Sequence, residues 1–367
     1  MNIAVIGNGA REEALIKAFA RSNHQPKLFN IATAINPGIL RYATILSLNS
    51  LNNCGNILYV LNDLAVDFVV IGPEAPLAAG LVDVLQAHNI QCIGPTKALA
   101  LIESSKGFCR NLLAPSLPQV LPKYKVCHSL QGVTEWLAQF NGQVVIKADG
   151  LMSGKGVFVA GEHFDDHQQA LKIIETLLKE QASVVLEEKL IGQEFSLISF
   201  SDGKSLIHMP LVQDNKRAYE QDMGPNTGGM GSVSYADHRL PFLTNDEILT
   251  AQKINEQTVA LLKQKTGEDY IGFLYGGFMV TADGIKLIEY NARLGDPEAI
   301  NLLGLLQTDL VDLCLAMLSQ NLKGIECQFA NQASVCKYIV PKAIHKKVNL
   351  DLFILIYLTQ LITVHLL

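Results

Sequence analysis

Short apolar runs that end in glycine turns and lead into helical patterns recur along the N-terminal part of the chain. The runs at 3–6, 27–32, 67–71 and 91–93 are typical of buried strands, and helical patterns cover 12–21 and 77–88. Strands that alternate with helices favour a parallel sheet with right-handed crossovers. Because ligands of such sheets bind at the carboxyl ends of the strands, we expect a binding site where these runs end.

Two of the turns carry polar side chains. The turn at 7–11 reads Gly-Asn-Gly-Ala-Arg between a strand and a helix, a layout that aims backbone N–H groups at an anion. A dinucleotide fingerprint needs a third glycine where Glu12 stands, so the turn is a weak NAD signal. It predicts a site for one phosphate beside Arg11, or a purely structural turn. Glu74, in the turn at 72–76, is either a ligand contact or a solvated acid.

Composition limits the class of protein. A length of 367 residues predicts two or three domains, and 49% hydrophobic with 17% charged residues indicates a packed globular chain. A net charge of -6 offers no basic surplus for nucleic acid. The cysteines are scattered without a Cys-x-x-Cys pair, which favours reduced thiols in the cytoplasm and no zinc. We expect neither a signal peptide nor a membrane partner.

The stretch at 286–298 predicts a metal site. Alternation along a strand puts Glu289, Asn291 and Arg293 on one face, and Ile288 with Tyr290 on the other. A carboxylate and an amide oxygen suit Mg²⁺, which takes the rest of its ligands from water and substrate phosphates. The arginine would meet the anion. The alternative is a strand whose polar face simply meets water.

A second stretch predicts phosphate binding. The strand at 143–147 ends in Lys147, and the next residues include Gly150, Gly154, Lys155 and Gly156 before a strand at 157–160. Such a loop is a flap of exposed amides over phosphates, or else a glycine-rich hairpin. It is not a Walker A loop, because that motif leads into a helix. On the helix at 97–111, Lys106 either reaches a phosphate or lies on the surface.

The remaining segments predict an adenine pocket and a long loop. A strand and connector at 183–190 could pair with an adenine edge, and Glu194 could bridge ribose hydroxyls. Antiparallel strands are expected at 194–201 and 206–209, a helix at 246–265 and a hairpin strand at 271–280. The glycine-dense segment that begins at 213 and includes 224–231 predicts a functional loop without regular structure.

These motifs together resemble the phosphoribosylamine–glycine ligase (glycinamide ribonucleotide synthetase) family of the ATP-grasp superfamily. The matching stretches lie in the family's order at 7–12, 72–77, 146–156, 224–231, 272–275 and 288–298, and the resemblance covers residues 1 to 342. It implies an α/β and α+β fold, with an N-terminal Rossmann-like parallel-sheet domain at 1–103. An ATP-grasp domain would follow at 104–330, with its flap-bearing subdomain at about 123–192. Residues 331–367 would be a remnant of a C-terminal domain plus a hydrophobic tail.

The resemblance also implies roles for particular residues. Glu289 and Asn291 would hold Mg²⁺ or Mn²⁺, and catalysis would rest on Arg293, Lys147 and Asp214. ATP would be bound by Lys106, Lys147, Gly154, Lys155, Gly156, Glu187, Glu188, Leu190 and Glu194. The substrates would be bound by Gly9, Arg11, Glu74, Asp214, Lys216, Asn226, Thr227, Gly228, Gly229, Arg293, Asp296 and Glu298.

The implied partners are ATP, glycine and 5-phosphoribosylamine, in a monomer or weak homodimer. Glycine would attack the γ-phosphate to give glycyl phosphate, and the amine would then displace phosphate, which needs no covalent nucleophile from the enzyme. Two departures from the family stand out. Ala10 and Glu13 replace a glycine and a histidine beside the expected phosphate, and the match stops at Ala343. Another ATP-grasp carboxylate–amine ligase and an inactive nucleotide-binding remnant are the alternatives.

Overall fold

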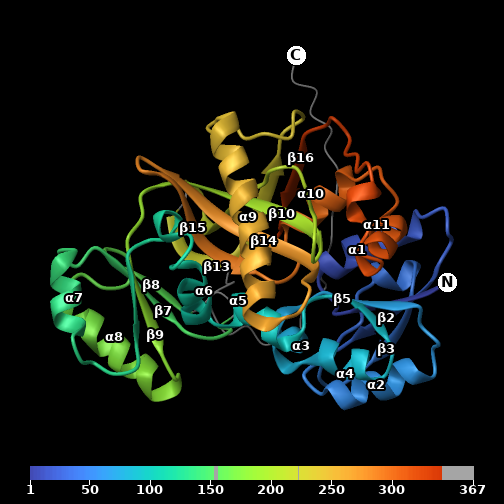
Figure 1. Cartoon of the computed structure of the whole chain (residues 1–367), viewed down its shortest axis with the longest axis horizontal. Coiled ribbons are helices and arrows are strands. Elements are labelled where there is room, and N and C mark those ends of the chain that lie inside the picture. The colour runs from blue at the N-terminus through green and yellow to red at the C-terminus, as the bar shows by residue number, and fades with distance from the viewer. Residues whose placement is uncertain (153–155, 222, 341–367) are drawn as a thin grey trace.

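The computed structural model describes residues 1–152, 156–221 and 223–340, and its N-terminal part forms the expected parallel sheet (Figure 1). The strands lie in the order β3-β2-β1-β4-β5, all parallel. Their bounds are β1 (Asn2–Ile6), β2 (Lys27–Ala32), β3 (Thr44–Ser47), β4 (Phe68–Ile71) and β5 (Gln91–Ile93). Alternate residues of β1 and β4 enter two different hydrophobic cores, so both faces of the sheet are covered.

The helices around this sheet differ from the sequence prediction in three places, because α2 (Cys54–Asn62) was not predicted and two expected helices are divided. The helix expected at 77–88 is divided at Gly80, whose φ of +88° lies in the left-handed region. The helix expected at 97–111 is divided at Ser105, whose extended backbone and hydroxyl cap the second part. The bounds are α1 (Ala10–Ala20), α2 (Cys54–Asn62), α3 (Glu74–Ala79), α4 (Leu81–Ala87), α5 (Lys97–Ser104) and α6 (Lys106–Leu113).

A lobe with its own core lies at the end of the molecule away from the N-terminal sheet (Figure 1). Its antiparallel sheet has the order β6-β9-β7-β8 and packs against two helices. The elements are β6 (Tyr124–Cys127), α7 (Val133–Gln139), β7 (Val144–Ala148), β8 (Val157–Val159), α8 (His167–Glu180) and β9 (Val184–Glu188). We call this the flap lobe, because β7 and β8 flank the predicted glycine flap.

A central antiparallel sheet joins the two ends. Its order is β11-β10-β14-β15, and α9 crosses it. The Gly94 amide donates to the Ile271 carbonyl oxygen (3.0 Å), which ties the N-terminal sheet to this one. The elements are β10 (Gly192–Asp202), β11 (Leu206–His208), α9 (Asn245–Thr266), β14 (Ile271–Thr281), β15 (Gly284–Asn291), α10 (Glu298–Leu305) and α11 (Leu310–Leu318).

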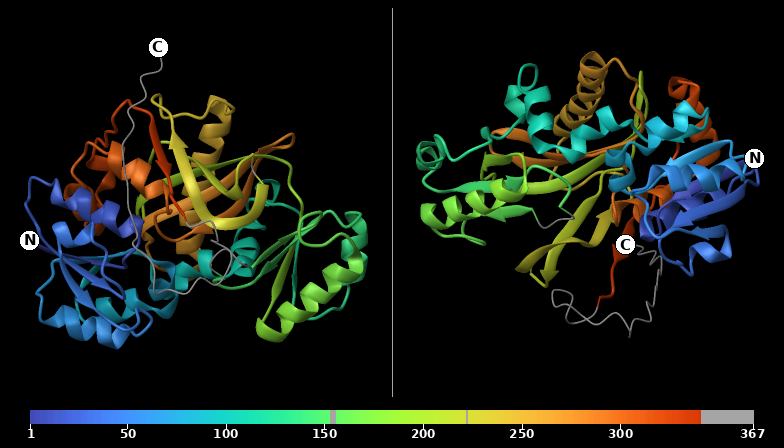
Figure 2. Two further views of the ribbon diagram at one scale, coloured as in Figure 1. Left: turned by 180° about the vertical axis from the view of Figure 1, so that it is seen from behind. Right: turned by 90° about the horizontal axis from the view of Figure 1, so that it is seen from below.

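The glycine-dense segment that begins at 213 is a strand pair, and the prediction of a loop without regular structure was wrong. β12 (Gln213–Tyr219) pairs with β13 (Met223–Ser234), and β16 (Ser334–Lys337) adds to β13. Figure 2 shows this sheet between the flap lobe and the N-terminal sheet. No helix in the described ranges is long and apolar enough to cross a membrane.

Candidate active site

The strand β15 carries the predicted metal ligands, and a bulge sets their direction. Gly277 pairs with Glu289 and Phe278 with Leu287, so Ile288 is the extra residue of the bulge. Ile285 and Leu287 can therefore share the buried face with Tyr290. Glu289 and Asn291 lie on the other face, as predicted, but β15 ends at Asn291 and Arg293 lies beyond it. The prediction that Ile288 and Tyr290 lie on the same face of the strand was wrong, because the bulge at Ile288 breaks the alternation of side chains.

Positive side chains from separate segments surround the Glu289 carboxylate. Burial by itself would raise the pKa of Glu289, but Lys216, Lys147, Lys106 and Arg293 outweigh it and hold that pKa below its ordinary value. Glu289 is therefore ionised at neutral pH. An ionised carboxylate beside the Asn291 amide oxygen is a donor set that fits Mg²⁺ or Mn²⁺.

Lys147 is fixed by a buried ion triad. Its Nζ pairs with Glu187 Oε2 (2.7 Å), and Arg110 Nε pairs with Glu187 Oε1 (2.7 Å). Burial would raise the pKa of Glu187, but Arg110 and Lys147 together lower it to about 2. Arg110 Nη2 (2.6 Å) and Lys147 Nζ (3.2 Å) both donate to the carbonyl oxygen of Ile288. The triad therefore links the predicted phosphate ligand to the bulge beside Glu289.

Lys106 reaches the same region from the start of α6. Its Nζ donates to the carbonyl oxygen of Gly150 (3.1 Å). Burial lowers the pKa of Lys106, and Glu289 acts in the opposite direction. Asp149 accepts from the Gly107 amide (3.2 Å) and the Ser183 hydroxyl (2.7 Å). These contacts hold the end of β7, where the flap begins, against the helix that carries Lys106.

The strand pair β12–β13 brings in the predicted acceptor-side residues. Lys216 Nζ lies 3.2 Å from Glu194 Oε2 and 3.4 Å from Asp214 Oδ2. Burial opposes the charge on Lys216, but these two carboxylates outweigh it and raise its pKa. Thr227 Oγ1 donates to the Lys216 carbonyl oxygen (2.8 Å) and accepts from the Gly229 amide (3.1 Å). Asn226 pairs across the two strands with Arg217, and a Cβ added at Gly228 would meet open space.

Glu298 lies at the start of α10 with almost no exposure to solvent. It accepts from Tyr275 Oη (2.8 Å), and the same Tyr275 oxygen lies 2.6 Å from Ser196 Oγ. Burial and the carboxylate of Asp214 raise the pKa of Glu298 to about 7. This carboxyl therefore exchanges its proton near neutral pH, unlike Glu289.

Arg293 is held by acids from the N-terminal part. Its Nε lies 3.2 Å from Glu74 Oε2, and its Nη2 lies 3.1 Å from Glu103 Oε1 and donates to Asn291 Oδ1 (3.2 Å). Burial would raise the pKa of Glu74, but Arg293 and a backbone N–H lower it. Glu103 Oε2 also accepts from the Ala292 amide (2.7 Å). Helices α3 and α5 of the N-terminal part thus position the residues that follow β15.

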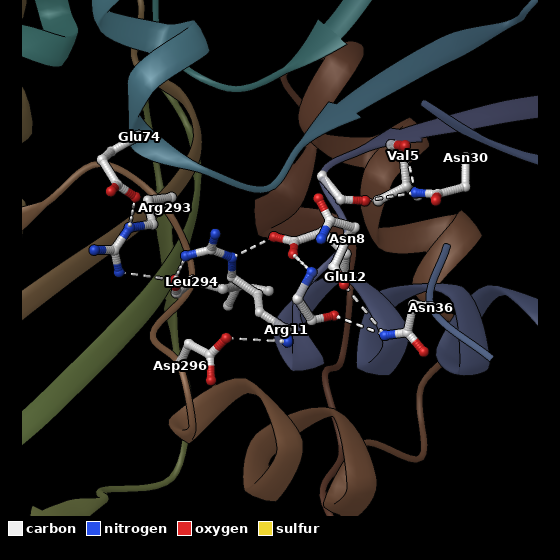
Figure 3. A network of polar contacts seen from close by, with 12 residues as sticks. Val5, Asn8, Arg11, Glu12, Asn30, Asn36, Glu74, Arg293, Leu294 and Asp296 are labelled. Atoms are coloured by element: carbon white, nitrogen blue, oxygen red, sulfur yellow. Dashed lines mark hydrogen bonds and ion pairs between the residues drawn. The ribbon is translucent and has the colours of Figure 1, made fainter. Parts of the chain in front are cut away.

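Glu12 fills the turn at 7–11 (Figure 3). Its carboxylate accepts from the Gly9 amide (2.6 Å) and pairs with Arg11 Nε (2.6 Å). A Cβ at Gly7 would lie 2.8 Å from Glu12 Cδ, and one at Gly72 would overlap the same side chain. Position 12 therefore holds a carboxylate where a dinucleotide turn has glycine. The substrate contacts of Gly9 and Arg11 stay predictions.

Asp296 and Gly229 meet beside this turn. Asp296 Oδ2 accepts from the Arg11 amide (3.4 Å), and its Oδ1 accepts from Tyr338. Gly229 has a φ of +137°, and a Cβ there would lie 2.7 Å from Cδ of Pro297. Only glycine allows β13 to approach this closely.

The predicted adenine and flap residues are placed less completely. Glu188 Oε1 accepts from the Lys123 amide (2.9 Å), and Leu190 follows β9 as a partly buried residue. The Gly156 carbonyl oxygen accepts from the Ala148 amide (2.8 Å). Gly154 and Lys155 lie outside the described residues, as do residues 341–367. The roles assigned to all these residues stay predictions.

Sequence reasoning missed Arg110, Glu103 and Tyr275. Arg110 lies four residues after Lys106, a spacing that places both on one face of a helix, but no role was predicted for it. Glu103 carries no local signal, because its partner Arg293 comes from a distant segment. Tyr275 ends the matching stretch at 272–275, but its contact with Glu298 joins segments that the stretch does not connect.

Comparisons with known proteins agree with the motifs. Residues 1–103 match the family model of the phosphoribosylglycinamide synthetase N domain, and residues 104–299 match that of the phosphoribosylglycinamide synthetase ATP-grasp (A) domain. The phosphoribosylamine–glycine ligase of Methanocella arvoryzae is 45% identical over 341 residues, which cover 93% of this chain and 78% of that protein. The protein of the same name from Methanocorpusculum labreanum is 43% identical with the same coverage.

Solved structures agree as well. The phosphoribosylamine–glycine ligase of Thermotoga maritima has a TM-score of 0.73 at 26% identity, covering 91% of this chain and 79% of that chain. The N5-carboxyaminoimidazole synthetase of Staphylococcus aureus complexed with ADP, at 13% identity, has a TM-score of 0.66 and covers 92% and 82%, which shows a shared fold alone. The resemblance drawn from the motifs and the predicted fold class are confirmed.

Proposed function

The chain belongs to the phosphoribosylglycinamide synthetase family, and from this membership and the geometry of its site we propose that it joins glycine to 5-phosphoribosylamine. The products would be glycinamide ribonucleotide, ADP and phosphate. As a carbon–nitrogen ligase of purine biosynthesis, it would work in the cytoplasm. The convergence of Lys106, Lys147, Lys216 and Arg293 on the Glu289 carboxylate is the observation that supports this proposal best.

The first chemical step explains the need for these cations. The glycine carboxylate attacks the γ-phosphorus of ATP, the bond from this phosphorus to the β–γ bridging oxygen breaks, and ADP leaves. Two anions must approach each other, and fixed positive side chains offset their repulsion. In this proposal Lys147 and Lys106 bind the ATP phosphates, and Arg293 binds a carboxylate or phosphoryl oxygen. The acids that pair with them fix their positions before the substrates arrive.

The donor set of β15 fits a divalent cation. Glu289 and Asn291 would hold Mg²⁺ or Mn²⁺, and the ionised state of Glu289 agrees with this role. When bound, the ion supplies positive charge against the triphosphate.

The second step forms the amide. The amine of phosphoribosylamine attacks the carbonyl carbon of glycyl phosphate, the bond from this carbon to the phosphate oxygen breaks, and the amine loses a proton. Glu298 and Asp214 lie on the predicted acceptor side, and the pKa of Glu298 near 7 would let its carboxyl take up or release a proton at neutral pH. The side chain of Glu187 is engaged by Arg110 and Lys147, so an adenine contact at this position would use the backbone of β9.

Product analysis tests the proposal. The purified chain is incubated with ATP, Mg²⁺, glycine and phosphoribosylamine formed in place from ribose 5-phosphate and ammonia, and products are measured by mass spectrometry. We expect one glycinamide ribonucleotide per ADP, and no amide when glycine is replaced by β-alanine or acetate. An amide formed with another carboxylic acid, but not with glycine, would contradict the proposed substrate. Binding of ATP without any amide would contradict the proposed activity of this chain.

A further inference from the structure

Arg110 is a buried cation that no step of the proposed reaction uses. It is 2% exposed, and its guanidinium donates to Glu187 Oε1, to the carbonyl oxygen of Ile288 and, through Nη1, to Cys109 Sγ (4.0 Å). A buried arginine costs desolvation free energy that good geometry must offset. Glu187 and Ile288 lie outside α6, the helix that carries Arg110, at 77 and 178 residues away in sequence.

The triad has a net charge that depends on Arg110. Lys147 and Glu187 alone make a neutral pair at 2.7 Å, in which the carboxylate cancels the positive charge that a phosphate would meet. Arg110 binds the other oxygen of the same carboxylate at 2.7 Å. Two cations and one carboxylate give a group with one positive charge in excess, whereas Lys147 and Glu187 without Arg110 would have none.

Arg110 also touches the backbone that aims the metal ligand. Its Nη2 donates to the carbonyl oxygen of Ile288, the bulge residue directly before Glu289. Lys147 donates to the same oxygen, so both cations hold the bulge from one side. A planar guanidinium can bond a carboxylate and a carbonyl at the same time in a fixed geometry.

We propose that Arg110 is a positioning residue, which keeps the positive charge of Lys147 available to ATP phosphate and fixes the bulge beside Glu289. This inference rests on the proposed ATP site. Outer partners of such sites are worth about 10–100-fold in affinity or activity. We therefore expect Arg110→Met to raise the dissociation constant of MgATP about 10–100-fold.

The test measures MgATP binding to the whole chain by calorimetry, with urea unfolding measured separately for each variant. Arg110→Lys keeps the charge but loses the fork that bonds Glu187 and Ile288 together, so it is expected to bind MgATP more tightly than Arg110→Met and less tightly than the wild type. The matched control is Lys263→Met, which removes a cation from the ion pair with Asp269 (2.5 Å) away from the site and is expected to leave MgATP affinity unchanged.

A double variant separates charge from folding. Arg110→Met with Glu187→Gln leaves Lys147 with its full positive charge, so it is expected to bind MgATP more tightly than Arg110→Met alone. If the single variant does not fold, the double variant is expected to bind within about tenfold of the wild type.

Distinct outcomes decide the matter. A folded Arg110→Met variant with wild-type affinity would overturn the inference and leave the ATP site standing. A double variant that binds MgATP no better than the folded single variant would also overturn it. If the single variant is unfolded, a double variant with an affinity more than about tenfold below that of the wild type would overturn it. A wild-type chain that does not bind MgATP would overturn the ATP site and, with it, the role of Arg110.

Discussion

For Glu298 the structure gives both the size and the sign of the change in unfolding free energy with pH. Its pKa rises from an ordinary value of 4.5 to about 7 in the folded chain, chiefly through burial and then through Asp214. A rise of about 2.5 corresponds to about 3 kcal/mol. Because the folded state holds the proton more tightly than the unfolded state, the free energy of unfolding falls as pH rises from 4.5 through 7.

The variant Glu298→Gln should remove this dependence. The glutamine keeps the shape and an oxygen that can accept from Tyr275 Oη, but it carries no charge. Its gain in unfolding free energy over wild type should be near zero at pH 4.5 and reach about 3 kcal/mol at pH 8. The matched control is Glu180→Gln on the exposed end of α8, with an expected change within about 0.5 kcal/mol at each pH.

Urea unfolding followed by circular dichroism measures this gain at each pH. Circular dichroism is preferred to tryptophan fluorescence, because the single tryptophan, Trp136, lies in the flap lobe and its fluorescence would mainly report the unfolding of that lobe. A gain for Glu298→Gln that is the same at pH 5 and pH 8, or no gain at pH 8, would refute the reasoning from burial and Asp214.

Three further substitutions test other parts of the site. Lys147→Met leaves Glu187 paired with Arg110 and removes a charged donor worth about 1.5–3 kcal/mol. Calorimetry should therefore show an affinity for MgATP about 10–100-fold lower than that of the wild type. An unchanged affinity would contradict the role of Lys147. In Arg293→Lys the lysine cannot contact Glu74 and Glu103 at the same time, as the arginine fork does. The kcat/KM for glycine should therefore fall about tenfold or more in a folded protein. An unchanged kcat/KM would count against the role of Arg293. Gly229→Ala places a Cβ 2.7 Å from Cδ of Pro297 and should lose about 1–3 kcal/mol in urea, whereas Gly228→Ala meets open space and serves as its control. Equal stability of the two glycine variants would contradict the close packing.

Local patterns were sufficient for the elements whose physics is local. The strands β1, β2, β4 and β5 are apolar along their lengths and end in glycine or small polar turns, so the parallel sheet followed from the sequence. β3 was missed because it is a partly exposed edge strand with a weak pattern. The β12–β13 pair was missed because its glycines and polar residues indicate a loop, although the two strands follow each other in the chain and only the added strand β16 is distant in sequence.

Some residues of the candidate site could likewise be predicted from local patterns, and others could not. Glu289 and Asn291 were found together because they are two residues apart on one strand, and the bulge at Ile288 leaves that relation intact. The bulge itself, and the roles of Arg110 and Glu103, could not be predicted. The roles of Arg110 and Glu103 depend on contacts between segments far apart in the chain, and the bulge depends on the register of the β14–β15 hairpin. A single sequence displays neither.

The transfer of a carboxylate oxygen tests the central claim most directly. Glycine labelled with ¹⁸O in its carboxylate is supplied with ATP, Mg²⁺ and phosphoribosylamine, and the released phosphate is analysed by mass spectrometry. If the site activates glycine as glycyl phosphate, each phosphate carries one ¹⁸O atom from glycine and the amide retains the other. Amide product accompanied by unlabelled phosphate would contradict the account.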